Sequence, residues 1–342
     1  MKFDIARQPL VPTFLTLAAL AVVAMWNAGG PAVSMAVQAG HAAGTVDIGR
    51  NAAGALAVSS PGELLAQFQA AHPVWARWIA GLLMLFTGMS IGRLTVRYNL
   101  YSVGTCLAIP LYGAIACGLA VGGDCLTTFA ASALLALATK NFCRSYCNGF
   151  GFDAIFRASL YIGLLPLVAT AAAPLLILLP LAVMLFRRTL REAVVALSGA
   201  ILPLFFAGFI HWAAGGRFDG PVRQVAAAIT SDSGYRFFDG NTLFSLIAWG
   251  VIFFLLICSA AGVLLDIRTL KTKPRNILFY NLYVLCVVAG IYFVPYSSPI
   301  TLTLAAPAAA TLIPVVLTKF NSAAASMFYT VLILLSLVLG LI

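Results

Sequence analysis

The segment ASLYIGLLPLVATAAAPLLILLPLAVMLF, residues 158–186, runs for 29 residues between Arg157 and Arg187 without a charged side chain. A helix that crosses a bilayer needs about 20 apolar residues, so this segment is too long for one crossing and short for two. Three prolines interrupt it: Pro166, Pro174 and Pro180. The number of times that it crosses decides the orientation of every later segment.

The composition of the whole chain indicates a membrane protein. Of its 342 residues, 62% are hydrophobic and only 9% are charged, and the mean hydropathy is +1.01. A soluble domain carries roughly 25% charged residues. The sequence also lacks the alternating apolar and polar strands that a membrane β-barrel needs. The composition therefore predicts a single all-α domain over residues 1–342, built as a bundle of transmembrane helices.

Nine further runs approach the length of a membrane-spanning helix. They lie at residues 10–27, 74–92, 100–121, 125–139, 193–212, 241–265, 277–294, 300–318 and 323–342. The first run does not end at the small-residue cleavage site of a signal peptide, and more spans follow it. We therefore interpret it as a membrane anchor.

The distribution of lysine and arginine favours two crossings of residues 158–186, because basic residues near helix ends accumulate on the cytoplasmic side. A single crossing divides the twenty basic residues ten to ten, whereas a hairpin leaves fifteen inside and five outside. The five outer residues are Arg50, Arg77, Arg217, Arg223 and Arg236. The sequence thus predicts a short, proline-broken hairpin, about eleven membrane segments, an inner N-terminus and an outer C-terminus. Arms this short are stable only inside protein or beside a polar cavity.

The first predicted outer loop, residues 28–73, contains a helix signal. Ser60 and Glu63 have the spacing of a capping box, and Pro61 occupies the first helical position. Four apolar residues then share one face: Leu64, Leu65, Phe68 and Ala71. The pattern predicts a short helix over residues 61–72, which either lies on the membrane surface or packs on the bundle.

The second predicted outer loop, residues 213–240, is the most polar stretch of the chain. It interleaves charged and aromatic residues: Arg217, Phe218, Asp219, Arg223, Asp232, Tyr235, Arg236, Phe237, Phe238 and Asp239. Arginine beside an aromatic ring can bind a phosphate or the face of a sugar. The candidate binding residues here are Arg217, Arg223, Arg236, Tyr235 and Phe237. The alternative is a solvated connecting loop with weak surface ion pairs.

A second candidate site lies at the inner end of the predicted hairpin, in a basic turn. Its members are Arg187, Arg188 and Arg191, followed by Glu192. A turn of this kind sets topology and contacts anionic headgroups. We also consider that it holds the phosphate of a lipid-linked substrate. At the other mouth of the hairpin, Asp153 and Arg157 are four residues apart and are predicted to pair.

The sequence carries no signature of a familiar catalytic chemistry. It lacks a phosphate-binding glycine loop with a lysine, an HExxH motif and a GxSxG motif. The three histidines come from separate segments without metal-ligand spacing, so neither a metal nor a cofactor is predicted. Seven cysteines exclude a complete disulfide framework. Only Cys117 and Cys125, which flank a short outer turn, are placed to pair.

Three stretches carry a resemblance to a known family: FDAIFRASLYIGLLPL (152–167), LFRRTLREAVVALSGAILPLFF (185–206) and LAAPAAATLIPVVL (304–317). The pattern is an apolar hairpin, a basic turn with Arg191 and Glu192, and a helix. That helix contains Gly199 and Pro203. The pattern resembles a family of multi-spanning bacterial membrane proteins, typical of Bacteroidota, that is described only as a domain of unknown function. The resemblance covers about residues 75–340 and implies the bacterial inner membrane.

The organisation is also similar to that of multi-spanning glycosyltransferases that use polyprenyl-phosphate sugars. That similarity implies a catalytic carboxylate in the first outer loop, where the acids are Asp47 and Glu63. Two hypotheses remain. The first is a cell-envelope component that binds, moves or scaffolds an amphiphilic phosphate-bearing lipid or an envelope complex. The second is a glycosyltransferase with Asp47 as the base.

The predicted partners follow from the charge of the two sides. The outer side holds six acids and five bases, so it is nearly neutral, and it is rich in aromatic residues. Such a surface suits sugars, lipid tails or a partner helix. Membrane lipids, a polyprenyl-linked sugar or other envelope proteins are therefore the expected partners, and nucleic acid is not.

Overall fold

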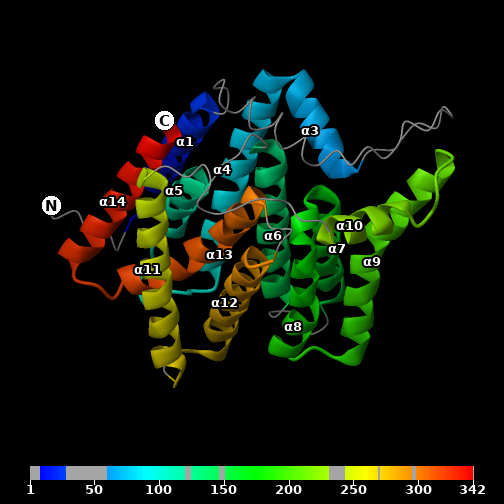
Figure 1. Cartoon of the computed structure of the whole chain (residues 1–342). Coiled ribbons are helices and arrows are strands. Elements are labelled where there is room, and N and C mark those ends of the chain that lie inside the picture. The colour runs from blue at the N-terminus through cyan, green and yellow to red at the C-terminus, as the bar shows by residue number, and fades with distance from the viewer. Residues whose placement is uncertain are drawn as a thin grey trace.

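The computed structural model describes residues 8–27, 60–119, 125–145, 151–230, 243–268, 270–294 and 298–341 (Figure 1). Within these ranges the protein is all-α, with 13 α-helices and two 3₁₀ helices. Seven helices are long and apolar enough to cross a membrane. The chain is therefore a multi-pass membrane protein, as the composition predicted.

The seven long apolar helices are α4 (Pro73–Arg97), α6 (Cys125–Ser145), α9 (Leu190–Ala213), α11 (Leu243–Leu265), α12 (Thr272–Tyr292), α13 (Pro299–Leu317) and α14 (Ser322–Leu341). The other elements are α1 (Leu10–Asn27), α3 (Pro61–Ala71), α5 (Ala108–Leu119), α7 (Phe152–Val168), η2 (Thr170–Ile177), α8 (Leu178–Leu185), α10 (Gly220–Thr230) and η3 (Asp266–Arg268). Seven of the nine predicted spans coincide with the long helices. The remaining two correspond to the shorter helices α1 and α5.

Helix α5 is shorter than the predicted span at residues 100–121, because helical structure starts only at Ala108. The chain leaves α4 through Asn99, which has a left-handed backbone with φ of 47°. The Tyr101 hydroxyl then donates to the Thr311 carbonyl at 3.0 Å, and the Leu107 N–H donates to the Thr105 hydroxyl at 3.3 Å. The first bond fastens this segment to α13, and the second satisfies a backbone N–H at the start of α5.

Helix α13 lies at the centre of the bundle and is the most deeply buried of the seven long helices. It packs against α4, α5, α6, α11 and α12. Its alanines let neighbouring helices approach closely. It also contains Pro307 and Pro314, and the hydroxyl groups of Ser259 and Tyr101 donate to its backbone carbonyls. Neighbouring side chains thus hydrogen-bond to the backbone of a proline-containing buried helix.

Residues 158–186 fold back on themselves at Ala169, whose backbone is extended. Helix α7 ends beside α3, because a Cβ on Gly62 would lie 2.2 Å from the Val168 carbonyl oxygen. The chain then returns through η2 and α8 to Arg188, whose guanidinium reaches Ser145 at the end of α6. The two ends of the segment therefore lie together at the end of the bundle away from α3, as a hairpin requires.

Helix α3 forms where the capping box predicted it and ends one residue earlier, at Ala71. The Ser60 hydroxyl accepts from the Glu63 N–H at 3.3 Å, and the Glu63 carboxylate accepts from the Ser60 N–H at 3.0 Å. The Gln69 side chain accepts from the Leu126 N–H at 3.1 Å and so caps the start of α6. Helix α3 is therefore fastened to the bundle, while its apolar side chains Leu64 and Phe68 stay exposed.

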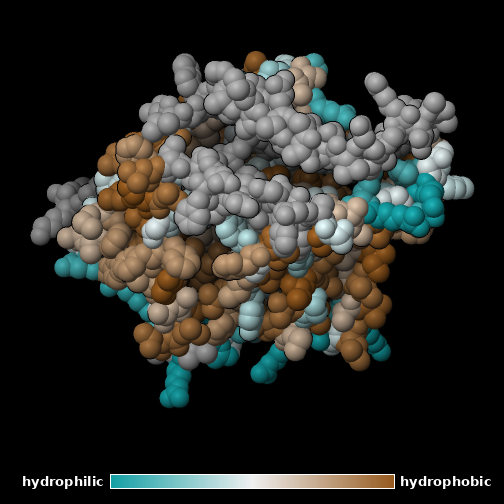
Figure 2. Space-filling view, in the orientation of Figure 1, coloured by the Kyte–Doolittle hydropathy of each residue, from teal (hydrophilic) through white to brown (hydrophobic). Residues whose placement is uncertain are grey.

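The predicted outer loop 213–240 contains a second surface helix, α10, and is not a simple connector. Figure 1 shows α3 and α10 at the same end of the bundle, opposite the turn between α8 and α9. Figure 2 shows a broad belt of hydrophobic side chains on the flank of the molecule, with hydrophilic side chains projecting from the rim below it. This distribution is the one expected of a bundle in a bilayer.

Candidate functional site

The turn between α8 and α9 builds the most elaborate polar arrangement around the predicted site residues. Arg187 adopts a left-handed backbone with φ of 50°, which is uncommon for a residue other than glycine. The Arg187 and Arg188 N–H groups donate to the carbonyls of Met184 and Val183 at 3.1 and 2.9 Å. These bonds end α8 and direct the chain towards α9.

Helix α9 begins with a capping box formed by Thr189 and Glu192. The Thr189 hydroxyl accepts from the Glu192 N–H at 3.4 Å, and the Glu192 carboxylate accepts from the Thr189 N–H at 3.0 Å. The same motif starts α3, but the environments differ. The Glu63 side chain lies on an exposed helix, whereas Glu192 is buried.

Burial of Glu192 is accompanied by an ion pair with Arg188. The Arg188 Nη1 lies 3.3 Å from the Glu192 Oε1, and the two side chains are 10% and 3% exposed. The Arg188 Nη2 donates to the Ser145 hydroxyl at 2.9 Å, and the Gly151 N–H donates to the Glu192 Oε1 at 3.5 Å. The pair therefore joins the end of α6, the start of α7 and the start of α9. The charges of Arg188 and Glu192 neutralise each other. The Arg188 guanidinium is therefore already used in a contact within the protein.

The other two arginines of the turn face outward. Arg187 and Arg191 are exposed, and no ion pair of the described residues includes either of them. Leu190 between them is 87% exposed, and Val194 on the next turn of α9 is also exposed. The arrangement places two positive charges at the edge of an apolar surface. Such an edge is suited to a phosphate whose attached chains lie in the bilayer.

The second predicted site is divided between described and undescribed residues. Arg217 and Arg223 both pair with Asp219, at 3.2 and 2.6 Å. The Phe218 ring packs edge-on against Phe205 with 5.3 Å between the ring centroids. Both arginines are thus already paired with a carboxylate. The other three candidates, Tyr235, Arg236 and Phe237, lie outside the described residues, as does Asp47.

Two further sequence predictions, an ion pair and a disulfide, are decided by the structure. Asp153 and Arg157 form the predicted ion pair at 2.9 Å. Among the described cysteines, Cys117 and Cys125 are not joined by a disulfide. Their thiols donate to different groups, the Ser336 carbonyl at 3.8 Å and the Gln69 side-chain oxygen at 3.7 Å. The described part of the chain contains no group of three metal-ligating side chains.

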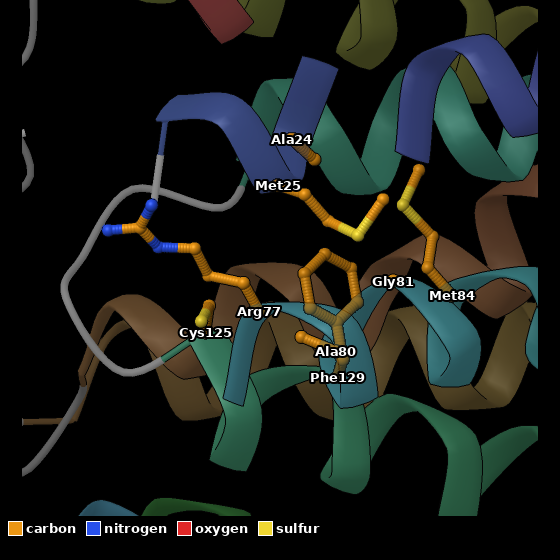
Figure 3. A pocket seen from close by; sticks show the side chains of 8 residues that line it. All are labelled: Ala24, Met25, Arg77, Ala80, Gly81, Met84, Cys125 and Phe129. Carbon is orange, nitrogen blue, oxygen red and sulfur yellow. The ribbon is translucent and has the colours of Figure 1, made fainter. Parts of the chain in front are cut away.

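The described residues also line two cavities. The first, of about 10 Å³, is lined by Ala24, Met25, Arg77, Ala80, Gly81, Met84, Cys125 and Phe129. Figure 3 shows the Arg77 guanidinium directed away from Phe129 and Met84. This space accommodates about one water molecule. The second cavity, of about 300 Å³, is lined by residues that include Gln8, Thr95 and Tyr101, next to the segment that connects α4 to α5. Its volume is at the lower limit of small-molecule sites.

Two partners in the α8–α9 turn were not foreseen from the sequence. Ser145 and Gly151 come from distant segments and carry no local signal. The ion pair itself has one, because Arg188 and Glu192 are four residues apart and Thr189 has capping-box spacing to Glu192. Comparison of the chain with protein-family models, with curated proteins and with solved structures finds no match. The functional conclusion therefore depends on the geometry of the site.

Proposed function

We propose that this multi-pass membrane protein is a cell-envelope component of the bacterial inner membrane that binds a phosphate-bearing lipid at the α8–α9 turn. The proposal rests on the different environments of the three arginines in this turn. The Arg188 side chain is only 10% exposed and is neutralised by Glu192, whereas Arg187 and Arg191 are exposed beside an apolar surface. The turn thus presents two exposed positive charges from a backbone that its hydrogen bonds hold in place.

The chemistry of arginine suits this role. Its planar guanidinium donates two parallel hydrogen bonds to a phosphate, and it loses little conformational freedom in doing so. The capping box and the buried ion pair fix the backbone from which both arginines extend. Acyl chains then lie against the exposed apolar residues Leu190 and Val194.

The lipid is tested with a double substitution, Arg187→Gln with Arg191→Gln, and native mass spectrometry of co-purified lipid. We expect retention of phosphatidylglycerol to fall about 30-fold, because each basic residue near a headgroup contributes about 1 kcal/mol. The charge-matched control is Arg217→Gln with Arg223→Gln at the other end of α9. Equal retention by the wild type and the α8–α9 variant would leave the turn without a lipid-binding role.

The orientation is part of the proposal: the hairpin opens to the cytoplasm, together with the N-terminus. The charge distribution and the proximity of the two mouths of residues 158–186 support it. Single cysteines at Arg157 and Arg187, in a background without other cysteines, are offered a membrane-impermeant thiol reagent from outside. Neither should react before the membrane is opened. Reaction at one position alone would show that the segment crosses once.

A further inference from the structure

Four basic residues gather at one end of two neighbouring long helices, and none of them belongs to the α8–α9 turn described above. They are Arg93 and Arg97 of α4, and Lys140 and Arg144 of α6. On each helix the two residues are four positions apart and therefore share a face. Helices α4 and α6 both begin beside α3, which adjoins α4 directly and caps α6 through Gln69. The two helices thus run in parallel, and their basic ends lie at the same end of the bundle (Figure 1).

The four charges are close enough to repel one another. Lys140 is half-buried, and the positive charges of Arg93, Arg144 and Arg97 all act on its ammonium group. The three arginines are exposed. The Arg97 guanidinium lies 5.9 Å from the centroid of the Tyr98 ring, a distance at which the ring face attracts a cation.

The described acids do not neutralise this group. Four of the five pair with other basic residues: Asp153 with Arg157, Glu192 with Arg188, Asp219 with Arg217 and Arg223, and Asp266 with Lys319. The fifth, Glu63, belongs to the capping box of α3 at the opposite end of α4. Within the described segments, no ion pair therefore neutralises Arg93, Arg97, Lys140 or Arg144.

A role in topology alone does not account for the arrangement. Basic residues set orientation from any position near a helix end, so that role does not require four of them to converge on one pair of helices. Convergence without acids is instead what an anion-binding site requires. Since neighbouring helices are about 8–10 Å apart and four residues rise about 6 Å, the four charges surround an area larger than one phosphate.

The geometry points to a binding site for an anion that carries two phosphate groups, held between Arg93, Arg97, Lys140 and Arg144. Its position at the ends of two membrane helices places the anion at the depth of lipid headgroups. A lipid with a two-phosphate headgroup and a soluble diphosphate share this chemistry. The site does not include any residue of the α8–α9 turn, so it stands or fails independently of the function proposed above.

The test compares the wild type with the variant Arg93→Gln and Lys140→Gln. A control variant, Arg268→Gln with Lys271→Gln, removes the same charge from two exposed residues between α11 and α12. Binding is measured in nanodiscs that contain cardiolipin, which has two phosphates, or phosphatidylglycerol at equal total charge. Sodium pyrophosphate is added as a competitor in a separate series. Thermal unfolding of each protein in lipid-free detergent accompanies the binding data.

We expect the Arg93/Lys140 variant to bind cardiolipin about 30-fold more weakly than the wild type, because two headgroup contacts are removed. The control should bind cardiolipin as the wild type does. The three proteins should differ far less in their affinity for phosphatidylglycerol. In lipid-free detergent the variant should unfold at the same or a higher temperature than the wild type, because removing two of the four charges relieves repulsion. If pyrophosphate competes with cardiolipin, the site is assigned to a soluble diphosphate. If pyrophosphate does not compete, the site is assigned to the lipid.

Two results would overturn the site. Equal cardiolipin affinity in the wild type and the Arg93/Lys140 variant would show that the four residues do not bind it. An equal loss for cardiolipin and phosphatidylglycerol would show that they do not select two phosphates. A failure confined to Arg187 and Arg191 would instead concern only the α8–α9 turn.

Discussion

The two ends of helix α9 carry ion pairs of the same kind in opposite environments. At its start, Arg188 and Glu192 are 3.3 Å apart, and their side chains are 10% and 3% exposed. Just beyond its end, Arg223 and Asp219 are only 2.6 Å apart, yet their side chains are 64% and 42% exposed. Both pairs join residues four positions apart. The shorter distance therefore belongs to the pair that water surrounds.

Environment decides which pair matters for stability. In water an exposed pair gains little, because the solvent screens the charges and the side chains lose conformational freedom. A buried pair has already lost its hydration, so removing one partner leaves an unneutralised charge in a medium of low dielectric constant. The start of α9 should accordingly be sensitive to charge substitutions, and its end should tolerate them.

The largest effect is expected from Glu192→Ala, which leaves Arg188 buried without its carboxylate. The loss in free energy of unfolding should be about 3–5 kcal/mol. The matched control is Asp153→Ala, which breaks another pair with four-residue spacing whose side chains are 55% and 70% exposed. It should cost about 1 kcal/mol or less. Unfolding by SDS in mixed micelles measures both, and equal losses would contradict the comparison.

Packing between α7 and α9, about two turns along α9 from the buried pair, should give the second largest effect. A Cβ on Gly163 of α7 would lie 2.3 Å from the Ala200 carbonyl oxygen of α9, which is backbone and cannot turn aside. Gly163→Ala should therefore cost about 1–3 kcal/mol through overpacking. Gly250→Ala on α11 is the control, because a Cβ there would meet no atom within 4 Å apart from its chain neighbours and the nearby backbone of its own helix. The control should unfold at or slightly above the wild-type SDS concentration, and a matching loss there would indicate a general intolerance of alanine.

The sequence predicted those features that depend on neighbours along the chain. Helix α3 follows from the capping spacing of Ser60 and Glu63, and the Asp153–Arg157 pair follows from four-residue spacing on one helix. The long spans follow from hydropathy, because any 20-residue apolar run must satisfy its backbone within itself. In each case the partner groups are no more than a few residues apart.

What the sequence did not provide depends on contacts between distant segments. The non-helical segment before α5 is held by the bond from Tyr101 to Thr311, 210 residues away. The surroundings of the buried pair were not predicted for the same reason, because Ser145, which bonds to Arg188, is 43 residues away from it in the chain. Gly199 belongs to the family pattern, which gives no physical reason for a glycine at this position. The structure supplies that reason: a Cβ there would lie 2.8 Å from the Phe156 carbonyl oxygen of α7.

The capping boxes of α9 and α3 allow the same comparison of a buried and an exposed environment, with smaller expected losses in stability. Thr189→Ala and Ser60→Ala each remove one side-chain acceptor from a helix start, which typically costs about 1 kcal/mol. Thr189 should cost the more of the two, because its hydroxyl also lies 3.2 Å from the buried Glu192 carboxylate. Serine at position 189 should restore the wild-type value, since it keeps the hydroxyl. Unfolding of all three variants in one detergent gives the ranking, and a larger loss for Ser60→Ala would reverse it.

The smallest effect is expected from Asp219→Asn, which removes the carboxylate shared by Arg217 and Arg223. The loss should be about 1 kcal/mol or less, because all three side chains are more than one-third exposed. The effect of salt on stability should distinguish this exposed pair from the buried pair. At 1 M salt the screening length falls to about 3 Å, so the difference between Asp219→Asn and the wild type should vanish. The deficit of Glu192→Ala should persist at the same salt concentration, because ions do not enter the space between Arg188 and its neighbours. If salt instead abolished both differences, the start of α9 would have to be accessible to water, and the contrast between the two ends of the helix would be lost.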